Sequence, residues 1–219
     1  MSRFIFLVIF IVAGVSVTYF FIRPKEKPLP IINPVDLEPD MVDQDLLRVG
    51  FGHKIGAFSF FNQYGKTITE DEVKGKVYVA EYFFTTCKSI CPIMNKEMQR
   101  VFESYNDNPA FKILSFSVDP DVDTVEQMNR YAKKHGVYDD KTWHFLTGDK
   151  TELYQLARKS FFVLKPAEAQ NLGDAGSDFI HTNNFVLVDT KGRIRGYYDG
   201  TSSKEVNQLI HDIKHLLEE

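Results

Sequence analysis

The sequence predicts an α/β domain, a mixed β-sheet with flanking helices, preceded by an N-terminal transmembrane helix. Two observations predict the domain. Segments with the apolar pattern of buried strands alternate with amphipathic helical segments, and two short strands stand directly before the last helix. A third observation, a long run of uncharged apolar residues near the N-terminus, predicts the membrane helix.

The uncharged run extends over residues 4–22. A helix over these 19 residues rises about 28 Å, close to the hydrocarbon thickness of a bilayer. A cleaved signal peptide is the alternative, but its apolar region is usually shorter, about 7–15 residues. We therefore expect a membrane anchor at residues 1–23. Five of the nine prolines follow between Pro24 and Pro39, which predicts an extended linker over residues 24–44 and a folded domain over residues 45–219.

Composition narrows the classes of function. Hydrophobic residues make up 43% of the chain and charged residues 26%, as in a globular protein that can bury a core. The formal net charge is −4 and the sequence pI is about 5.9. This is not the basic excess of a nucleic-acid-binding protein, so we expect no nucleic-acid partner. Two cysteines are too few for a disulfide scaffold.

Strand and helix signals follow one another along the domain. We expect an entrance hairpin over residues 58–68 and further strands over residues 77–84, 111–118, 143–146, 185–188 and 194–198. Helices are predicted after Pro92, between a Thr124 cap and Gly136, after Asp149 and after Ser202. Residues 160–180 fit neither period and are expected to form a long loop. This order of elements is that of the thioredoxin-like fold.

Three residues separate Cys87 from Cys91, where the buried strand passes through a short loop into a helix. Cys91 is expected at the N-cap and Cys87 in the loop before it. The unpaired N–H groups and partial positive charge of a helix N-terminus favour a thiolate. Two thiolates there can exchange electrons as a dithiol–disulfide couple, or they can hold a soft metal ion. A structural disulfide is less favoured, because closing so small a loop stabilises little.

The spacing of the cysteines leaves room for a metal ion between the sulfurs. Two soft thiolates suit Cu(I), whereas a structural zinc site needs four ligands and the chain has no second cysteine pair. A third ligand has to come from elsewhere, and six histidines are available. His181 stands apart from the others because it follows the expected long loop and precedes the strand over residues 185–188. In a thioredoxin-like sheet this junction faces the cysteine loop.

Three motifs, in this order, resemble the Sco/SenC family over about residues 45–217. They are Cys87-Lys-Ser-Ile-Cys91-Pro92 after an aromatic strand, Ser117-Val-Asp119-Pro120-Asp-Val-Asp123-Thr124, and His181 before Phe185-Val-Leu-Val-Asp189. The resemblance implies a thioredoxin-like fold with an N-terminal membrane anchor. It also implies that copper, as Cu(I) or Cu(II), is bound by Cys87, Cys91 and His181.

Asp119 and Asp123 match the D-x-x-x-D pattern of the family, which is associated with metal handling or partner contact. An alternative explains both residues without a metal: an Asp–Pro turn after a strand and a helix N-cap. The chain departs from many relatives in the run Phe84-Thr85-Thr86, which lacks the histidine that they carry just before the first cysteine.

The resemblance implies a copper metallochaperone that assists assembly of the copper centre of cytochrome c oxidase, with subunit II or a similar protein as the copper acceptor. It also implies a place in the bacterial inner membrane, with the soluble domain facing the periplasm or extracytoplasmic space. The alternative is a thiol–disulfide oxidoreductase that reduces the cysteines of a partner protein. In that enzyme Cys87 is the attacking thiol and Cys91 the resolving one, because the loop cysteine is expected to be more exposed.

Overall fold

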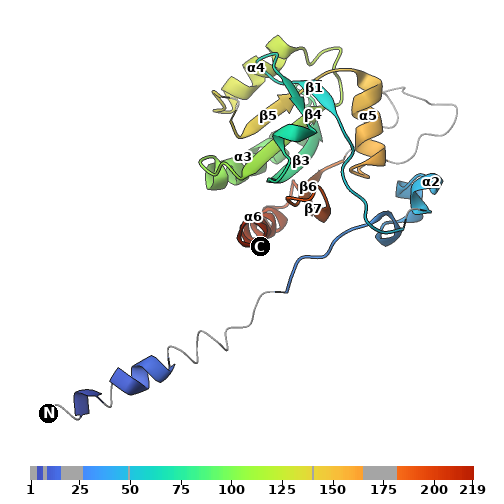
Figure 1. The fold of residues 1–219 in the computed structure, drawn as a ribbon. Coiled ribbons are helices and arrows are strands. Elements are labelled where there is room, and N and C mark those ends of the chain that lie inside the picture. Colours follow the sequence, from blue (N-terminus) through green and yellow to red (C-terminus); the bar gives the residue numbers. More distant parts are fainter. Residues whose placement is uncertain (1–3, 7–8, 16–26, 49, 140, 165–181) are drawn as a thin grey trace.

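A five-stranded mixed sheet forms the centre of the protein (Figure 1). The computed structural model describes all residues except 1–3, 7–8, 16–26, 49, 140 and 165–181. The strand order in the sheet is β5-β4-β3-β6-β7. The strands are β3 (Val77–Phe83), β4 (Phe111–Ser117), β5 (Trp143–Leu146), β6 (Asn184–Val188) and β7 (Ile194–Asp199). The first three run parallel to one another, while β6 and β7 are antiparallel to their neighbours, so the predicted mixed sheet is confirmed.

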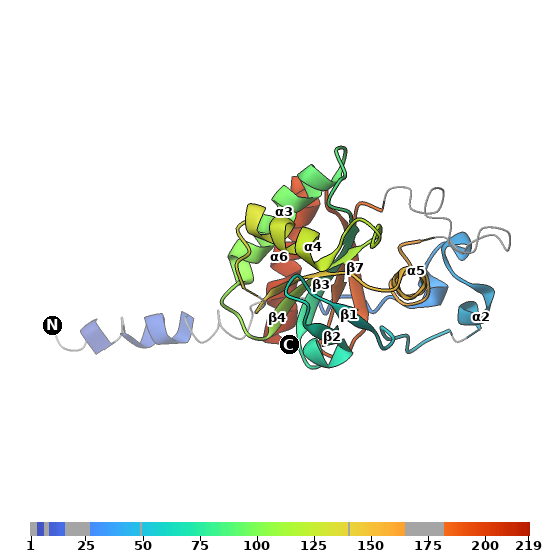
Figure 2. The ribbon, with the colours of Figure 1, turned by 90° about the horizontal axis from the view of Figure 1, so that it is seen from above.

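Helices cover both faces of this sheet (Figure 2). One face packs against α3 (Cys91–Tyr105), α4 (Val125–Lys134) and α6 (Ser203–Glu218). The other face packs against α5 (Lys150–Lys159) and the hairpin of β1 (Ser59–Phe61) and β2 (Thr67–Thr69). Short helical turns stand at α2 (Gln44–Leu47), η1 (Pro34–Asp36), η2 (Pro39–Met41) and η3 (Glu70–Glu72).

Alternation along β3 divides the core into two clusters, because successive side chains of a strand point to opposite faces. Val77, Val79 and Phe83 belong to the cluster that packs against α3, which we call the α3-side cluster. Tyr78 and Tyr82 belong to the cluster that packs against α5, which we call the α5-side cluster. A strand covered in this way is apolar over its whole length, which is the pattern that predicted it.

Three helices begin at the side-chain caps that the sequence predicts. Thr124 Oγ1 accepts a hydrogen bond from Gln127 N at 3.3 Å at the start of α4. Asp149 caps α5, and Ser202 caps α6. Gly136 follows α4 with a φ of +75°, a left-handed conformation that residues with a Cβ rarely adopt.

The segment before the domain lies along β7, the edge strand of the sheet. Ile32 N donates to Ile194 O at 2.9 Å. The buried Arg195 guanidinium donates to Pro30 O at 3.0 Å and to Leu29 O at 2.8 Å. Part of the proline-containing stretch is therefore bound to the sheet edge, whose main-chain groups it helps to cover.

The predicted transmembrane helix over residues 4–22 is wrong for the part of the chain that the structure describes, where no helix is long and apolar enough to cross a bilayer. The helical residues described near the N-terminus are 4–6 and 9–15.

Candidate functional site

The two cysteines lie where the sequence predicts, between the end of β3 and the start of α3. Cys91 is the first residue of α3 and Ile90 is its N-cap, so the helix begins one residue earlier than an N-cap at Cys91 implies. Ile90 O accepts from Met94 N at 3.0 Å, and Pro92 follows in the first turn, where its missing N–H costs nothing. Both cysteines are free thiols; Cys87 is partly exposed and Cys91 is buried, with 6% of its surface accessible.

The two sulfurs contact one another and differ in acidity. Burial alone would raise the pKa of Cys87, but hydrogen bonds from the Cys91 thiol and from Ser89 outweigh it and lower this pKa to about 7. Burial raises the pKa of Cys91 well above its usual value, and the adjacent Cys87 and the charge of Glu81 raise it further. At neutral pH the pair therefore holds one readily ionised sulfur and one thiol.

A small cavity of about 100 Å³ adjoins both sulfurs. It is lined by Tyr82, Phe83, Phe84, Cys87, Ser89, Ile90, Cys91, Val118 and Thr182. Thr182 reaches it because β6 runs antiparallel to β3, with Ala80 opposite Val186. The residues just before β6 therefore meet the end of β3 and the cysteine loop, as the sequence argument expects.

His181, the predicted third ligand, lies outside the described residues, but it directly precedes Thr182 in the chain. Within the described ranges, no group of three or more His, Cys, Asp or Glu side chains is placed to hold a metal ion. The two adjacent thiols are the part of the predicted ligand set that the structure describes. Their chemistry fits a soft metal ion.

Asp123 is completely buried and binds the beginning of the cysteine loop. Its carboxylate accepts from Thr85 N at 3.2 Å, from Thr85 Oγ1 at 2.5 Å and from Ser117 Oγ at 2.7 Å. Burial raises the pKa of Asp123, and these hydrogen bonds oppose the rise. The N-cap of α4 is Thr124, so the interpretation of Asp123 as an N-cap is wrong.

Asp119 lies in the turn that leads from β4 to α4. Its N–H donates to Ser117 Oγ at 3.0 Å, and its carbonyl accepts from Asp123 N at 2.8 Å. These main-chain contacts agree with the turn interpretation of Asp119. They bring Asp119 and Asp123 into one loop beside the cysteines.

Glu81 is a buried acid near the site that the sequence argument missed. Only 4% of it is exposed, and it accepts from Ser115 Oγ at 2.6 Å, which in turn accepts from Trp143 Nε1 at 2.8 Å. Burial raises the pKa of Glu81 to about 7, against the opposing hydrogen bond from Ser115. A carboxyl within the otherwise apolar run of β3 was the available signal, because a strand covered on both faces has no solvent for a charge.

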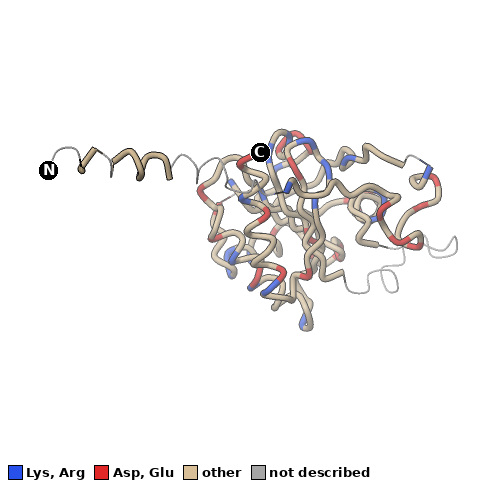
Figure 3. Tube along the Cα trace, turned by 90° about the horizontal axis from the view of Figure 1, so that it is seen from below, with Lys and Arg blue, Asp and Glu red and all other residues tan. Residues whose placement is uncertain are grey.

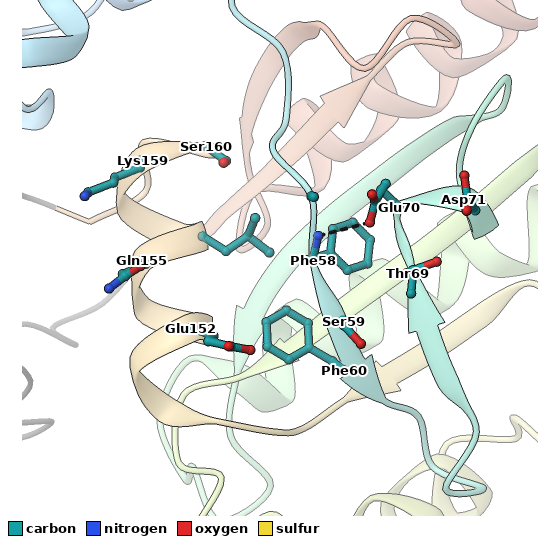
Figure 4. Close-up of a pocket in the computed structure, with 12 residues that line it drawn as sticks. Phe58, Ser59, Phe60, Thr69, Glu70, Asp71, Glu152, Gln155, Lys159 and Ser160 are labelled. Carbon is teal, nitrogen blue, oxygen red and sulfur yellow. Dashed lines mark hydrogen bonds between the residues drawn. The ribbon is translucent and has the colours of Figure 1, made fainter.

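A larger cavity of about 640 Å³ lies between the β1–β2 hairpin and α5 (Figure 4). Phe58 and Phe60 extend into it from the hairpin, while Glu152 and Gln155 line it from α5. Glu70 accepts from Phe58 N at 3.2 Å and so supports the fold of the hairpin. Among the described residues that line this cavity there is no cysteine or histidine, so the smaller pocket at the two thiols is the candidate site.

The family of the chain follows from comparison with known proteins. The SCO1/SenC family model matches residues 50–218, which contain Cys87, Cys91, Asp119, Asp123 and His181. The chain belongs to this family. The SCO1 protein homolog of Bacillus subtilis is 32% identical over 165 residues, which cover 74% of this chain and 82% of the relative.

Two solved structures share the fold of this SCO1/SenC member. BsSco, a member of the Sco family of cytochrome c oxidase assembly proteins in which a disulfide switch was identified, is 30% identical with a TM-score of 0.63, over 76% of this chain and 94% of its own. Copper-bound ScoI of Bradyrhizobium japonicum is 24% identical with a TM-score of 0.57, over 75% of this chain and 99% of its own, a likeness of fold alone.

Proposed function

We propose that the protein is a copper-binding assembly factor that helps to build the copper centre of cytochrome c oxidase. Copper is its cargo, held by Cys87 and Cys91 with His181 as the third ligand. The observation that carries the proposal is the pair of adjacent free thiols at the N-terminus of α3, in a pocket that the residue after His181 also lines. Membership of the SCO1/SenC family supports the same assignment.

The chemistry of the pair suits Cu(I). Two thiolates are soft ligands, and Cys87 already ionises near neutral pH. Cys91 has to lose its proton when the ion binds, so uptake releases protons. Two thiolates around one Cu(I) leave a net negative charge, which the N-terminus of α3 offsets in part.

Relatives support the acceptor that we propose. BsSco, which is 30% identical, belongs to a family of cytochrome c oxidase assembly proteins. We propose subunit II of the oxidase, or a similar protein, as the acceptor. Its cysteines would displace Cys87 first, because this sulfur is the more exposed of the two. As part of the proposal the domain works on the extracytoplasmic side of a bacterial membrane, and labelling of Cys87 in intact cells by a membrane-impermeant thiol reagent tests that side.

A second candidate function is thiol–disulfide exchange. The difference in acidity and exposure favours it: Cys87 is the accessible sulfur with a pKa of about 7, and Cys91 is the buried one. Cys87 would attack a partner's disulfide and Cys91 would resolve the mixed disulfide. Such an enzyme would need neither copper nor His181.

Anaerobic titration with Cu(I) against a competing chelator tests the copper assignment in the full chain. We expect Cys87→Ser and Cys91→Ser to abolish tight binding, and His181→Ala to weaken it by about tenfold or more, since a removed ligand loses its bond to the ion. His211→Ala is the matched control, because His211 lies on α6 beside Asp212 and is not one of the three proposed ligands. Wild-type affinity in His181→Ala would contradict the ligand set. A wild-type protein that binds no copper but reduces disulfides would replace the proposal with the oxidoreductase.

A further inference from the structure

The loop that carries Cys87 is fastened at its beginning to a different part of the chain. Thr85 offers both its N–H and its hydroxyl group to the Asp123 carboxylate, with hydrogen bonds of 3.2 and 2.5 Å. Gln127 Nε2, from α4, donates to the same hydroxyl oxygen at 3.1 Å. Ser117 Oγ, at the end of β4, donates to the other carboxylate oxygen of Asp123 at 2.7 Å. The first turn of the cysteine loop is therefore joined to both β4 and α4.

This contact is a strong one for its size. Asp123 has no exposed surface, so its charge depends on these donors in place of water. Hydrogen bonds to a buried charge contribute more than neutral ones, and losing one leaves an acceptor unsatisfied. The Thr85–Asp123 contact consequently fixes the beginning of the loop in the conformation that the structure shows.

That conformation gives the two sulfurs unequal access. Cys87 is partly exposed, whereas Cys91 is 6% exposed and shares its pocket with Phe84 and Ile90, which belong to the same loop. An incoming sulfur can meet Cys87 with the loop in place. Cys91, with 6% of its surface accessible, offers an incoming sulfur far less contact in this conformation.

We propose that the Thr85–Asp123 contact is a positioning clamp on the cysteine loop, that its opening is the step that exposes Cys91, and that Asp123 acts through this clamp. Asp123 is then a positioning residue and does not bind the metal ion. The clamp rests on the proposed function in one respect: a partner has to reach both sulfurs in turn. It applies equally to copper transfer and to thiol exchange.

A matched pair of substitutions isolates the clamp. Thr85→Val keeps the shape of the side chain and removes the hydroxyl group, while Thr85→Ser keeps the hydroxyl group. Both are made in the full-length Cys87→Ser protein, so that Cys91 is the one thiol, and its alkylation rate is followed by mass spectrometry without metal. We expect about a tenfold faster rate in Thr85→Val, because one hydrogen bond to a charged group is lost, and a rate within about twofold of the parent in Thr85→Ser.

Hydrogen exchange separates loop opening from general loss of stability. In Thr85→Val we expect faster amide exchange over residues 85–90, with unchanged protection in the sheet strands. Equal alkylation rates in the Val and Ser variants would overturn the proposal. So would faster exchange spread evenly over the domain. Should Thr85→Val fail to fold, Gln127→Ala removes the other partner of the Thr85 hydroxyl group. The proposal then requires a smaller increase in the alkylation rate of Cys91, about two- to threefold. An unchanged rate would overturn it.

Copper affinity tests whether Asp123 acts through the clamp, and this result is independent of the alkylation result. If Asp123 works only through Thr85, Asp123→Asn and Thr85→Val should change Cu(I) affinity by the same factor, within about threefold. A much larger loss in Asp123→Asn would make Asp123 a ligand and contradict the positioning role. A protein that binds no copper, yet exposes Cys91 in Thr85→Val, would remove the proposed function and leave the clamp standing.

Discussion

The buried carboxyl of Glu81 shows what single residues contribute to this fold and what they cost. Glu81 lies in β3 among Val79 and Phe83, and Ser115 donates to it at 2.6 Å. An ionised carboxylate in such surroundings is destabilising unless it is fully paired. Its charge also raises the pKa of the Cys91 thiol, so a residue that weakens the fold is coupled to the candidate site.

The raised pKa of Glu81 predicts a pH dependence of stability. Its pKa is about 7 in the folded protein and about 4.3 in an unfolded chain, so the folded state binds this proton more tightly. The contribution is therefore fully present below about pH 4 and is lost as the pH rises through 7. Urea unfolding should show the wild type losing about 3 kcal/mol over this window relative to Glu81→Gln. Parallel pH profiles for the two proteins would contradict the assignment.

Residue types and spacing located the cysteine pair, but not the groups around it. Cys87 and Cys91 belong to one loop-to-helix segment, so local sequence was enough to place them together. Thr85 and Asp123 are 38 residues apart, and their contact exists only because β3 and β4 are neighbours in the sheet. The role of Glu81 could not be predicted in this way, because an apolar strand pattern does not show which side chains surround a polar residue within the strand.

At the scale of elements, boundaries followed the local signals that set them. Thr124, Asp149 and Ser202 cap their helices as predicted, because a cap depends only on the next three residues. The boundaries of the strands were predictable within a residue or two, because they too follow from a local pattern. The short helical turns between residues 34 and 47 were not predicted, since their stability comes from packing against the α5-side cluster.

The attachment of the segment before the domain to β7 predicts an effect of one arginine. Arg195 is buried and joins Asp189, Glu219 and the carbonyl groups of Leu29 and Pro30. Arg195→Met should lower the free energy of unfolding by about 3 kcal/mol, because it leaves buried acceptors without their donor. Urea unfolding measures the loss, and hydrogen exchange at the Ile32 amide should accelerate.

Arg193→Met is the control for Arg195→Met. Arg193 also binds Asp189, but its side chain is partly exposed and does not contact the segment before the domain in the bonds described. We expect a smaller loss, about 1 kcal/mol, and unchanged exchange at Ile32. Equal effects of the two substitutions on Ile32 would show that the segment is held by something other than Arg195.

For the molecule as a whole, the core is organised more clearly than the distribution of charged residues. Acidic and basic residues are interspersed over the described domain (Figure 3). The core, by contrast, has a clear plan, with one cluster on each face of a single sheet. Alternate residues of β3, β4 and β6 belong to opposite clusters, so both clusters pack against the same strands. Disruption of the sheet on one face therefore disturbs the cluster on the other face. Sequence patterns predicted the layers, but the strand order required the pairing of distant segments.

This shared sheet predicts that the domain unfolds as one cooperative unit. Trp143, the only tryptophan, is buried in the α3-side cluster, while Leu153 of α5 is buried in the α5-side cluster. Leu153→Ala should cost about 3 kcal/mol by leaving a cavity. If the clusters unfold together, the urea transition seen by Trp143 fluorescence shifts by the same amount as that seen by circular dichroism. A fluorescence transition that stays in place while the circular dichroism transition moves would mean that the two faces unfold separately.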